Sequence, residues 1–119
     1  MVFSIKVEAV FSSAHNLRDY KGKCEELHGH NWKIEVVASR DKLDEPGMVL
    51  DFKYLKTKLN KVLEKLDHKY LNNVSYFKKV NPTSENIAKY IYDNLKSQVS
   101  SLKSVTVWEN DTSSARYEE

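Results

Sequence analysis

The chain has 119 residues, of which 40% are hydrophobic and 30% are charged, and 19 basic side chains stand against 17 acidic ones. This length predicts one domain over residues 1–119, and the near balance of charge argues against nucleic-acid or membrane binding through bulk electrostatics. The single cysteine rules out an internal disulfide. Lys6 and Glu8 interrupt the start of the chain, and no apolar stretch is long enough to span a bilayer. We therefore expect a cytoplasmic protein.

The first half of the chain predicts two strands. Apolar residues occupy every second position from Phe3 to Phe11, which is typical of a strand with one buried face, and His15 falls on the same face if the strand continues. Residues 16–26 are polar and predict a loop. Alternation resumes from His28 to Ala38, so we expect a second strand, antiparallel to the first.

The second half predicts two helices and then two more strands. Asp51 is a suitable N-cap for a helix whose apolar stripe extends to Leu66, and residues 81–85 start a second helix. Residues 103–109 and 115–117 are the expected last strands. The order β-β-α-α-β-β predicts an α+β fold, with an antiparallel four-stranded sheet and both helices on one face. Such a sheet has two open edges, which oligomerisation could cover.

Three histidines fall where the first two predicted strands meet. His28 and His30 are two residues apart, so their side chains leave the same face of a strand. Antiparallel pairing brings His15, at the end of one strand, beside the start of the next. Three imidazoles with a fourth position open are typical of catalytic zinc, although other transition metals also accept this ligand set. The alternative is three unrelated core or surface histidines.

Three further groups have both a functional and a structural interpretation. Cys24 lies in the loop ahead of His28, and it could be a fourth metal ligand, a proton-transfer group or an inert residue. Asp67 and His68 could form an acid–base pair, or they could simply end a helix. Glu109 continues a buried strand face, so its carboxylate needs a partner. That partner could be a structural cation or a ligand with paired N–H donors, such as guanine or a pterin.

Taken together, these residues resemble the 6-pyruvoyl-tetrahydropterin synthase / 6-carboxy-tetrahydropterin synthase family. The resemblance rests on five segments that occur in the family's order and span nearly the whole chain. They are Phe11-Ser12-Ser13-Ala14-His15, Cys24-x-x-x-His28-Gly29-His30-Asn31, Leu66-Asp67-His68-Lys69-Tyr70-Leu71-Asn72, Asn81-Pro82-Thr83-Ser84-Glu85-Asn86 and Val107-Trp108-Glu109.

The resemblance implies the tunnelling fold and assigns roles to individual residues. It implies a zinc ion held by His15, His28 and His30, with Cys24 as proton acceptor. It implies that Asp67 and His68 complete a proton relay and that Glu109 anchors the pterin ring. The implied catalytic residues are thus Cys24, Asp67, His68 and Glu109. Thr83 and Glu85 join Glu109 as candidate substrate-binding residues. The family's subunits assemble into trimers and then hexamers, with active sites at subunit interfaces.

The substrate implied by the resemblance is 7,8-dihydroneopterin triphosphate. The short gap between Cys24 and His28 resembles the 6-carboxy branch of queuosine biosynthesis, which releases acetaldehyde and triphosphate and leaves 6-carboxy-5,6,7,8-tetrahydropterin. The alternative enzyme is the 6-pyruvoyl synthase on the same site. A third possibility is a non-catalytic metal-, pterin- or purine-binding module on the same fold.

Overall fold

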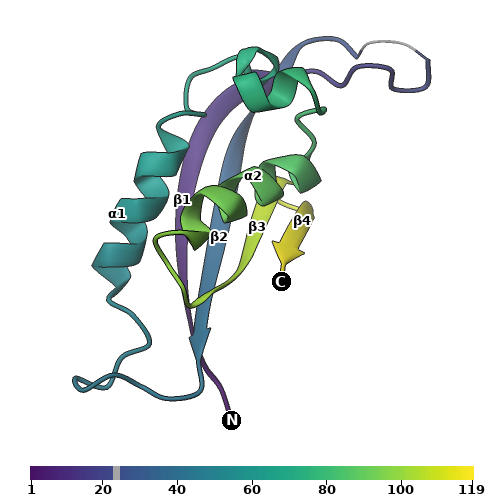
Figure 1. Cartoon of the computed structure of the whole chain (residues 1–119). Coiled ribbons are helices and arrows are strands. Elements are labelled where there is room, and N and C mark those ends of the chain that lie inside the picture. The colour runs from purple at the N-terminus through teal and green to yellow at the C-terminus, as the bar shows by residue number, and fades with distance from the viewer. Residues whose placement is uncertain (23–24) are drawn as a thin grey trace.

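The computed structural model describes residues 1–22 and 25–119, and it has the predicted order of elements (Figure 1). The elements are β1 (Phe3–His15), β2 (His28–Arg40), α1 (Phe52–Leu63), the 3₁₀ turns η1 (Leu71–Asn73) and η2 (Ser75–Lys78), α2 (Ser84–Lys96), β3 (Leu102–Asn110) and β4 (Ser113–Glu118). The strands form one antiparallel sheet in the order β1-β2-β3-β4. The α+β prediction is therefore confirmed.

Both helices cover the same face of the sheet, with α1 against β1 and α2 against β3 and β4 (Figure 1). Their apolar stripes pack on the inward side chains of the strands, and the largest buried side chains include Trp32, Phe11 and Phe77. Each helix starts with a side-chain cap: Asp51 accepts a hydrogen bond from the Lys53 N–H, and Thr83 accepts one from the Asn86 N–H. Neither helix is long and apolar enough to cross a membrane, among the residues that the structure describes.

Two predicted boundaries were wrong. The first helix was expected to end near residues 67–73, after an apolar stripe that reaches Leu66, but it ends at Leu63. The chain tightens there into turns in which the N–H groups of Lys65 and Leu66 bond to carbonyls three residues back. Leu66 is nevertheless fully buried, which is why it fitted the helical stripe. The last strand is longer than residues 115–117, because a tight turn over residues 111–112 lets Ser113 pair directly with Asn110.

The segment after α1 covers part of the outer edge of β1. The N–H of His68 donates to the Ser12 carbonyl at 2.6 Å, and the N–H of Ala14 donates to the Lys69 carbonyl at 3.0 Å. Ala14 and Tyr70 form an isolated parallel bridge. This short pairing fixes residues 67–70 beside the end of β1 that carries His15.

Candidate metal centre

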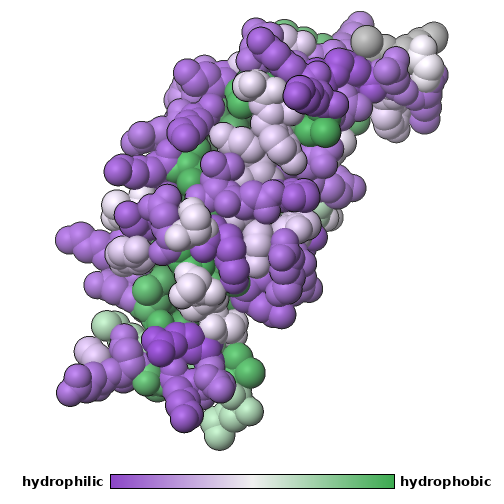
Figure 2. All heavy atoms as spheres, viewed as in Figure 1, coloured by the Kyte–Doolittle hydropathy of each residue, from purple (hydrophilic) through white to green (hydrophobic). Residues whose placement is uncertain are grey.

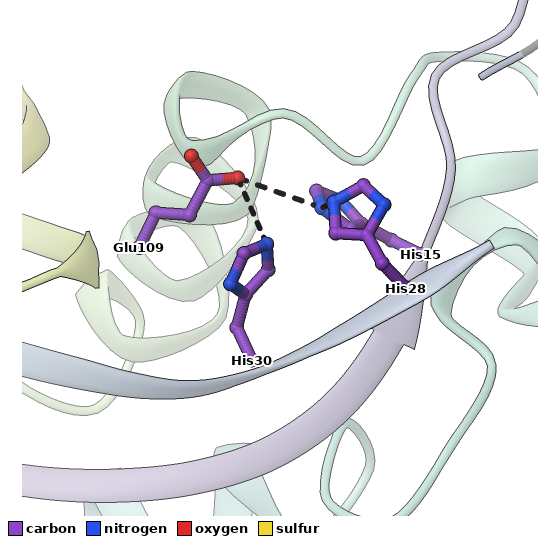
Figure 3. A group of neighbouring side chains, drawn as sticks. All are labelled: His15, His28, His30 and Glu109. Carbon is purple, nitrogen blue, oxygen red and sulfur yellow. Dashed lines mark hydrogen bonds and ion pairs between the residues drawn. The ribbon is translucent and has the colours of Figure 1, made fainter. Parts of the chain in front are cut away.

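Strand register brings the three predicted histidines to one corner of the sheet. His15 pairs with His28, and His30 lies opposite Ser13, so all three rings stand on the helix-covered face. Glu109, near the end of β3, reaches the same corner (Figure 3). One ligand atom from each of the four residues lies within 4.8 Å of the others. The group could therefore hold a metal ion.

Two backbone carbonyls orient the rings of His15 and His28. The Nδ1 of His15 lies 2.8 Å from the Pro82 carbonyl, and the Nδ1 of His28 lies 2.9 Å from the Glu26 carbonyl. A carbonyl can only accept, so both Nδ1 atoms carry hydrogen and both neutral rings present a bare Nε2 to the cluster. These two Nε2 atoms are only 3.0 Å apart. Two lone pairs at this distance repel each other unless a cation lies between them.

The spacing of the ligand atoms suits a metal ion. In a tetrahedral site with bonds of about 2.0–2.1 Å, ligand atoms lie about 3.3–3.4 Å apart. Glu109 Oε1 is 3.4 Å from the Nε2 of His30 and 3.5 Å from that of His15. The Nε2 of His30 is buried and makes no hydrogen bond with the described residues. A cation would satisfy this nitrogen, so the residues present fit a bound metal.

Trp32 forms the floor of the cluster. Its ring is fully buried and lies 4.9 Å from the His15 ring and 5.0 Å from the His30 ring, both edge to face. Burial lowers the pKa of His15, and the neighbouring rings of His28 and His30 lower it further, against a raising effect of the Pro82 carbonyl. A lowered pKa favours the neutral imidazole, which is the form that binds metal.

Asp67 and His68 lie along the edge of β1. Asp67 Oδ1 accepts a hydrogen bond from the Ser12 N–H at 2.9 Å, and this bond is the main reason that the pKa of Asp67 is lowered. Its Oδ2 lies 3.0 Å from Nδ1 of His68. His68 is 82% exposed and has φ of +56°, a left-handed conformation that is uncommon for a side chain of this size. The pair is thus preformed and faces solvent in the single chain.

The other predicted site residues are placed differently. Thr83 caps α2 through its hydroxyl, and Glu85 lies exposed in the first turn of that helix. Among the described residues, neither makes a hydrogen bond to the histidine cluster, so their predicted substrate contacts stay predictions. Cys24, the predicted proton acceptor, lies outside the described residues.

Two residues of the site's surroundings were missed from the sequence. Alternation placed Trp32 on the same strand face as His28 and His30, but it was not identified as a residue that contacts their rings. The Pro82 carbonyl gave no comparable signal, because every residue has a carbonyl and this one is 67 positions from His15.

Comparison with known proteins agrees with the predicted family. Residues 4–119 match the family model described as 6-pyruvoyl tetrahydropterin synthase. A Synechocystis protein named 6-carboxy-5,6,7,8-tetrahydropterin synthase is 42% identical over 116 residues, covering 92% of this chain and 88% of that protein. A Pyrococcus furiosus protein named dihydroneopterin monophosphate aldolase is 35% identical over 106 residues, covering 87% of this chain and 86% of that protein.

A solved structure agrees as well. The structure of Caenorhabditis elegans 6-pyruvoyl tetrahydropterin synthase superimposes with a TM-score of 0.88 at 29% identity, covering all of this chain and 96% of that one. The match over nearly the full length, in both sequence and structure, shows that this chain belongs to the 6-pyruvoyl tetrahydropterin synthase family.

Proposed function

We propose that the protein is a zinc-dependent 6-carboxy-5,6,7,8-tetrahydropterin synthase that acts in queuosine biosynthesis. Its substrate would be 7,8-dihydroneopterin triphosphate. The enzyme would convert this compound and one water molecule to 6-carboxytetrahydropterin, acetaldehyde and triphosphate. The observation that carries the proposal is the corner at which three histidines and Glu109 converge. The similarity to the Synechocystis protein favours the carboxy product.

In this proposal His15, His28 and His30 hold the zinc through their Nε2 atoms. A zinc ion bound there would act as a Lewis acid toward the side-chain hydroxyls of the substrate and would make neighbouring protons easier to remove. The Pro82 and Glu26 carbonyls support this role, because they fix the tautomer of His15 and His28 with the lone pair of each ring toward the site.

Protons would move through Cys24 and the pair Asp67 and His68. Asp67 accepts from Nδ1 of His68 and so leaves the Nε2 of that ring free to give or take a proton. The Ser12 N–H lowers the pKa of Asp67 and so favours its ionised form, which accepts hydrogen bonds. Cys24 would be the acceptor in the first proton transfer, as its place in the family's motif implies.

Glu109 would bind the pterin ring, with Thr83 and Glu85 as further contacts. A carboxylate accepts two parallel hydrogen bonds from the amino and ring N–H groups at the edge of a pterin. Its Oε1 lies within 3.5 Å of the Nε2 atoms of His15 and His30. A pterin bound to Glu109 would therefore lie beside the histidine cluster.

A second copy of the chain would complete the site. The hollow that adjoins His30, about 280 Å³ in volume, is open and is lined by Ser12, Ser13, Gly29, His30 and Asn31. Bound ligands usually have most of their surface buried, which one chain does not provide here. We propose assembly into trimers that pair as hexamers, so that neighbouring subunits close each site and cover the sheet edges.

The test is a product assay on purified protein with its zinc content measured on the same sample. We expect acetaldehyde, triphosphate and 6-carboxytetrahydropterin from 7,8-dihydroneopterin triphosphate, and loss of turnover in Cys24→Ala. A 6-pyruvoyl product without acetaldehyde would instead identify the alternative enzyme. Pterin binding without any turnover would favour a non-catalytic module. Dihydroneopterin monophosphate belongs in the assay, because one relative is named for its cleavage.

A further inference from the structure

The backbone of residues 16–18, which directly follow His15, is held by hydrogen bonds to residues that lie outside the strands. The N–H of Asn16 donates to Asn72 Oδ1 at 3.0 Å, and Nδ2 of Asn72 donates back to the Asn16 carbonyl at 2.8 Å. The same pattern recurs two residues later: the N–H of Arg18 donates to Asn81 Oδ1 at 2.9 Å, and Nδ2 of Asn81 donates to the Arg18 carbonyl at 2.8 Å. Two asparagines thus hold residues 16–18 at both ends.

Leu17, the middle residue, is bound to Glu25, the residue after Cys24. The N–H of Leu17 donates to Glu25 Oε1 at 3.2 Å, and the N–H of Glu25 donates to the Leu17 carbonyl at 2.8 Å. Glu25 directly follows Cys24 in the sequence. Segment 16–18 therefore connects the candidate ligand His15 to the neighbour of the candidate proton acceptor, and all six of its backbone polar groups are paired.

Asparagine has the chemistry that this arrangement needs. Its side-chain amide presents a donor and an acceptor side by side, so it can pair with a peptide group as a neighbouring strand would. Aspartate has the same shape but offers only acceptors when ionised. An aspartate here would therefore keep one hydrogen bond and set a negative oxygen against a backbone carbonyl.

Asn81 is also tied to His15 through its neighbour Pro82. The Pro82 carbonyl accepts from Nδ1 of His15, and the Asn81 carbonyl accepts from Nδ2 of Asn86 at 2.9 Å. The Arg18 guanidinium donates to the Val80 carbonyl at 2.9 Å, immediately before Asn81. Residues 80–82 thus fix both the ring of His15 and the backbone three residues beyond it.

We infer that Asn72 and Asn81 are positioning residues of the metal centre. By pairing with segment 16–18, they set the direction of the His15 ring and the start of the Cys24 loop, without themselves contacting metal or substrate. This inference rests on the proposed function for its effect on turnover, whereas its effect on metal binding needs only the histidine cluster.

The experiment compares Asn72→Asp and Asn81→Asp with Asn73→Asp. Asn73 is exposed and adjacent to Asn72, so it gives the same change of charge without the paired hydrogen bonds. We expect Asn81→Asp to weaken zinc binding, measured by chelator competition, by about 10–100-fold, which is typical for loss of a group that orients a metal ligand. We expect a changed visible absorption spectrum after cobalt substitution, and a kcat that falls more than KM rises.

Asn72→Asp should show the same changes in kcat and cobalt spectrum, with a smaller loss of zinc affinity, whereas Asn73→Asp should match the wild type throughout. If an aspartate variant does not fold by circular dichroism, Asn81→Ala and Asn72→Ala remove both hydrogen bonds without adding charge.

The inference would be overturned if folded variants at both positions had a lower Tm but a wild-type zinc affinity, cobalt spectrum and kcat, because the asparagines would then be merely structural. Failure of the proposed function has a different signature. Wild-type protein would then bind zinc but not convert 7,8-dihydroneopterin triphosphate, and the zinc affinity and cobalt spectra would still decide the role of the asparagines.

Discussion

The two ends of the β1–β2 ladder are built from the same pair of strands but carry different kinds of side chain. At one end His15 lies opposite His28, and bare ring nitrogens face each other at 3.0 Å. At the other end Phe3 lies opposite Arg40, and half-exposed apolar side chains line a hollow of about 310 Å³. Figure 2 shows hydrophobic residues at the surface of this end of the molecule. Between the two ends the strands carry the fully buried core residues Ile34, Val36 and Trp32.

The contrast separates the part of the ladder that stabilises the fold from the part that could bind metal. Apolar burial in the middle of the ladder stabilises the sheet at about 25 cal/mol per Å² of area removed from water. The histidine end instead buries the Nε2 of His30, which makes no hydrogen bond with the described residues; this costs free energy that a bound cation would offset. Substitutions at the histidine end should therefore change metal binding, and substitutions in the middle should change folding.

The largest expected effect is that of His28→Ala on metal binding. Loss of a group that merely orients a ligand already costs about 10–100-fold in affinity, so loss of a ligand should cost more than about 100-fold and abolish turnover. Chelator competition and metal analysis measure the effect. His68→Ala is the matched control, because His68 is exposed at the edge of β1 and should leave metal affinity unchanged. Full metal stoichiometry in His28→Ala would contradict the three-histidine site.

Ile34→Ala tests the middle of the ladder. This residue is fully buried, so its truncation should lower the free energy of unfolding by about 2–5 kcal/mol in a denaturant titration. Metal affinity of the folded fraction should stay near that of the wild type. Phe3→Ala, at the far end and 40% exposed, should cost less than Ile34→Ala. A large loss of metal affinity in Ile34→Ala would contradict this prediction, because it would show that metal binding depends on packing in the middle of the ladder.

Glu109→Gln tests the pterin-binding role at the histidine end. The substitution removes a charged acceptor whose hydrogen bonds contribute about 1.5–3 kcal/mol, so KM for the pterin substrate should rise on the order of 10–100-fold. Pterin binding measured by fluorescence titration checks this without turnover. Unchanged pterin affinity together with weakened zinc binding would instead assign Glu109 to the metal.

The smallest expected effect is the pH dependence of Asp67. Its pKa is lowered in the folded protein, chiefly by the Ser12 N–H, so its contribution to stability is present above the unfolded pKa of about 4 and is lost as the pH falls through the folded pKa. Asp67→Asn should therefore have a lower Tm than the wild type at pH 7, and the two curves should converge toward pH 3. A constant gap between them would rule out this linkage.

The sequence by itself determined the order of the elements and the meeting of the three histidines. Both follow from local periodicity: strand alternation puts His28 and His30 on one face, and antiparallel pairing adds His15. The family could also be predicted from the sequence, because five short segments occur in the family's order over nearly the whole chain.

Only the tertiary structure decided how these histidines are held. Pro82 orients His15, and Asn72 and Asn81 hold the residues that follow it, across 56 to 67 positions of sequence. The tertiary structure also decided that Asp67 accepts a hydrogen bond from the Ser12 N–H and that α1 ends at Leu63. The physical reason is that these interactions use backbone N–H and carbonyl groups. Every residue except proline has both groups, so the pattern of side chains does not predict which backbone groups will form hydrogen bonds.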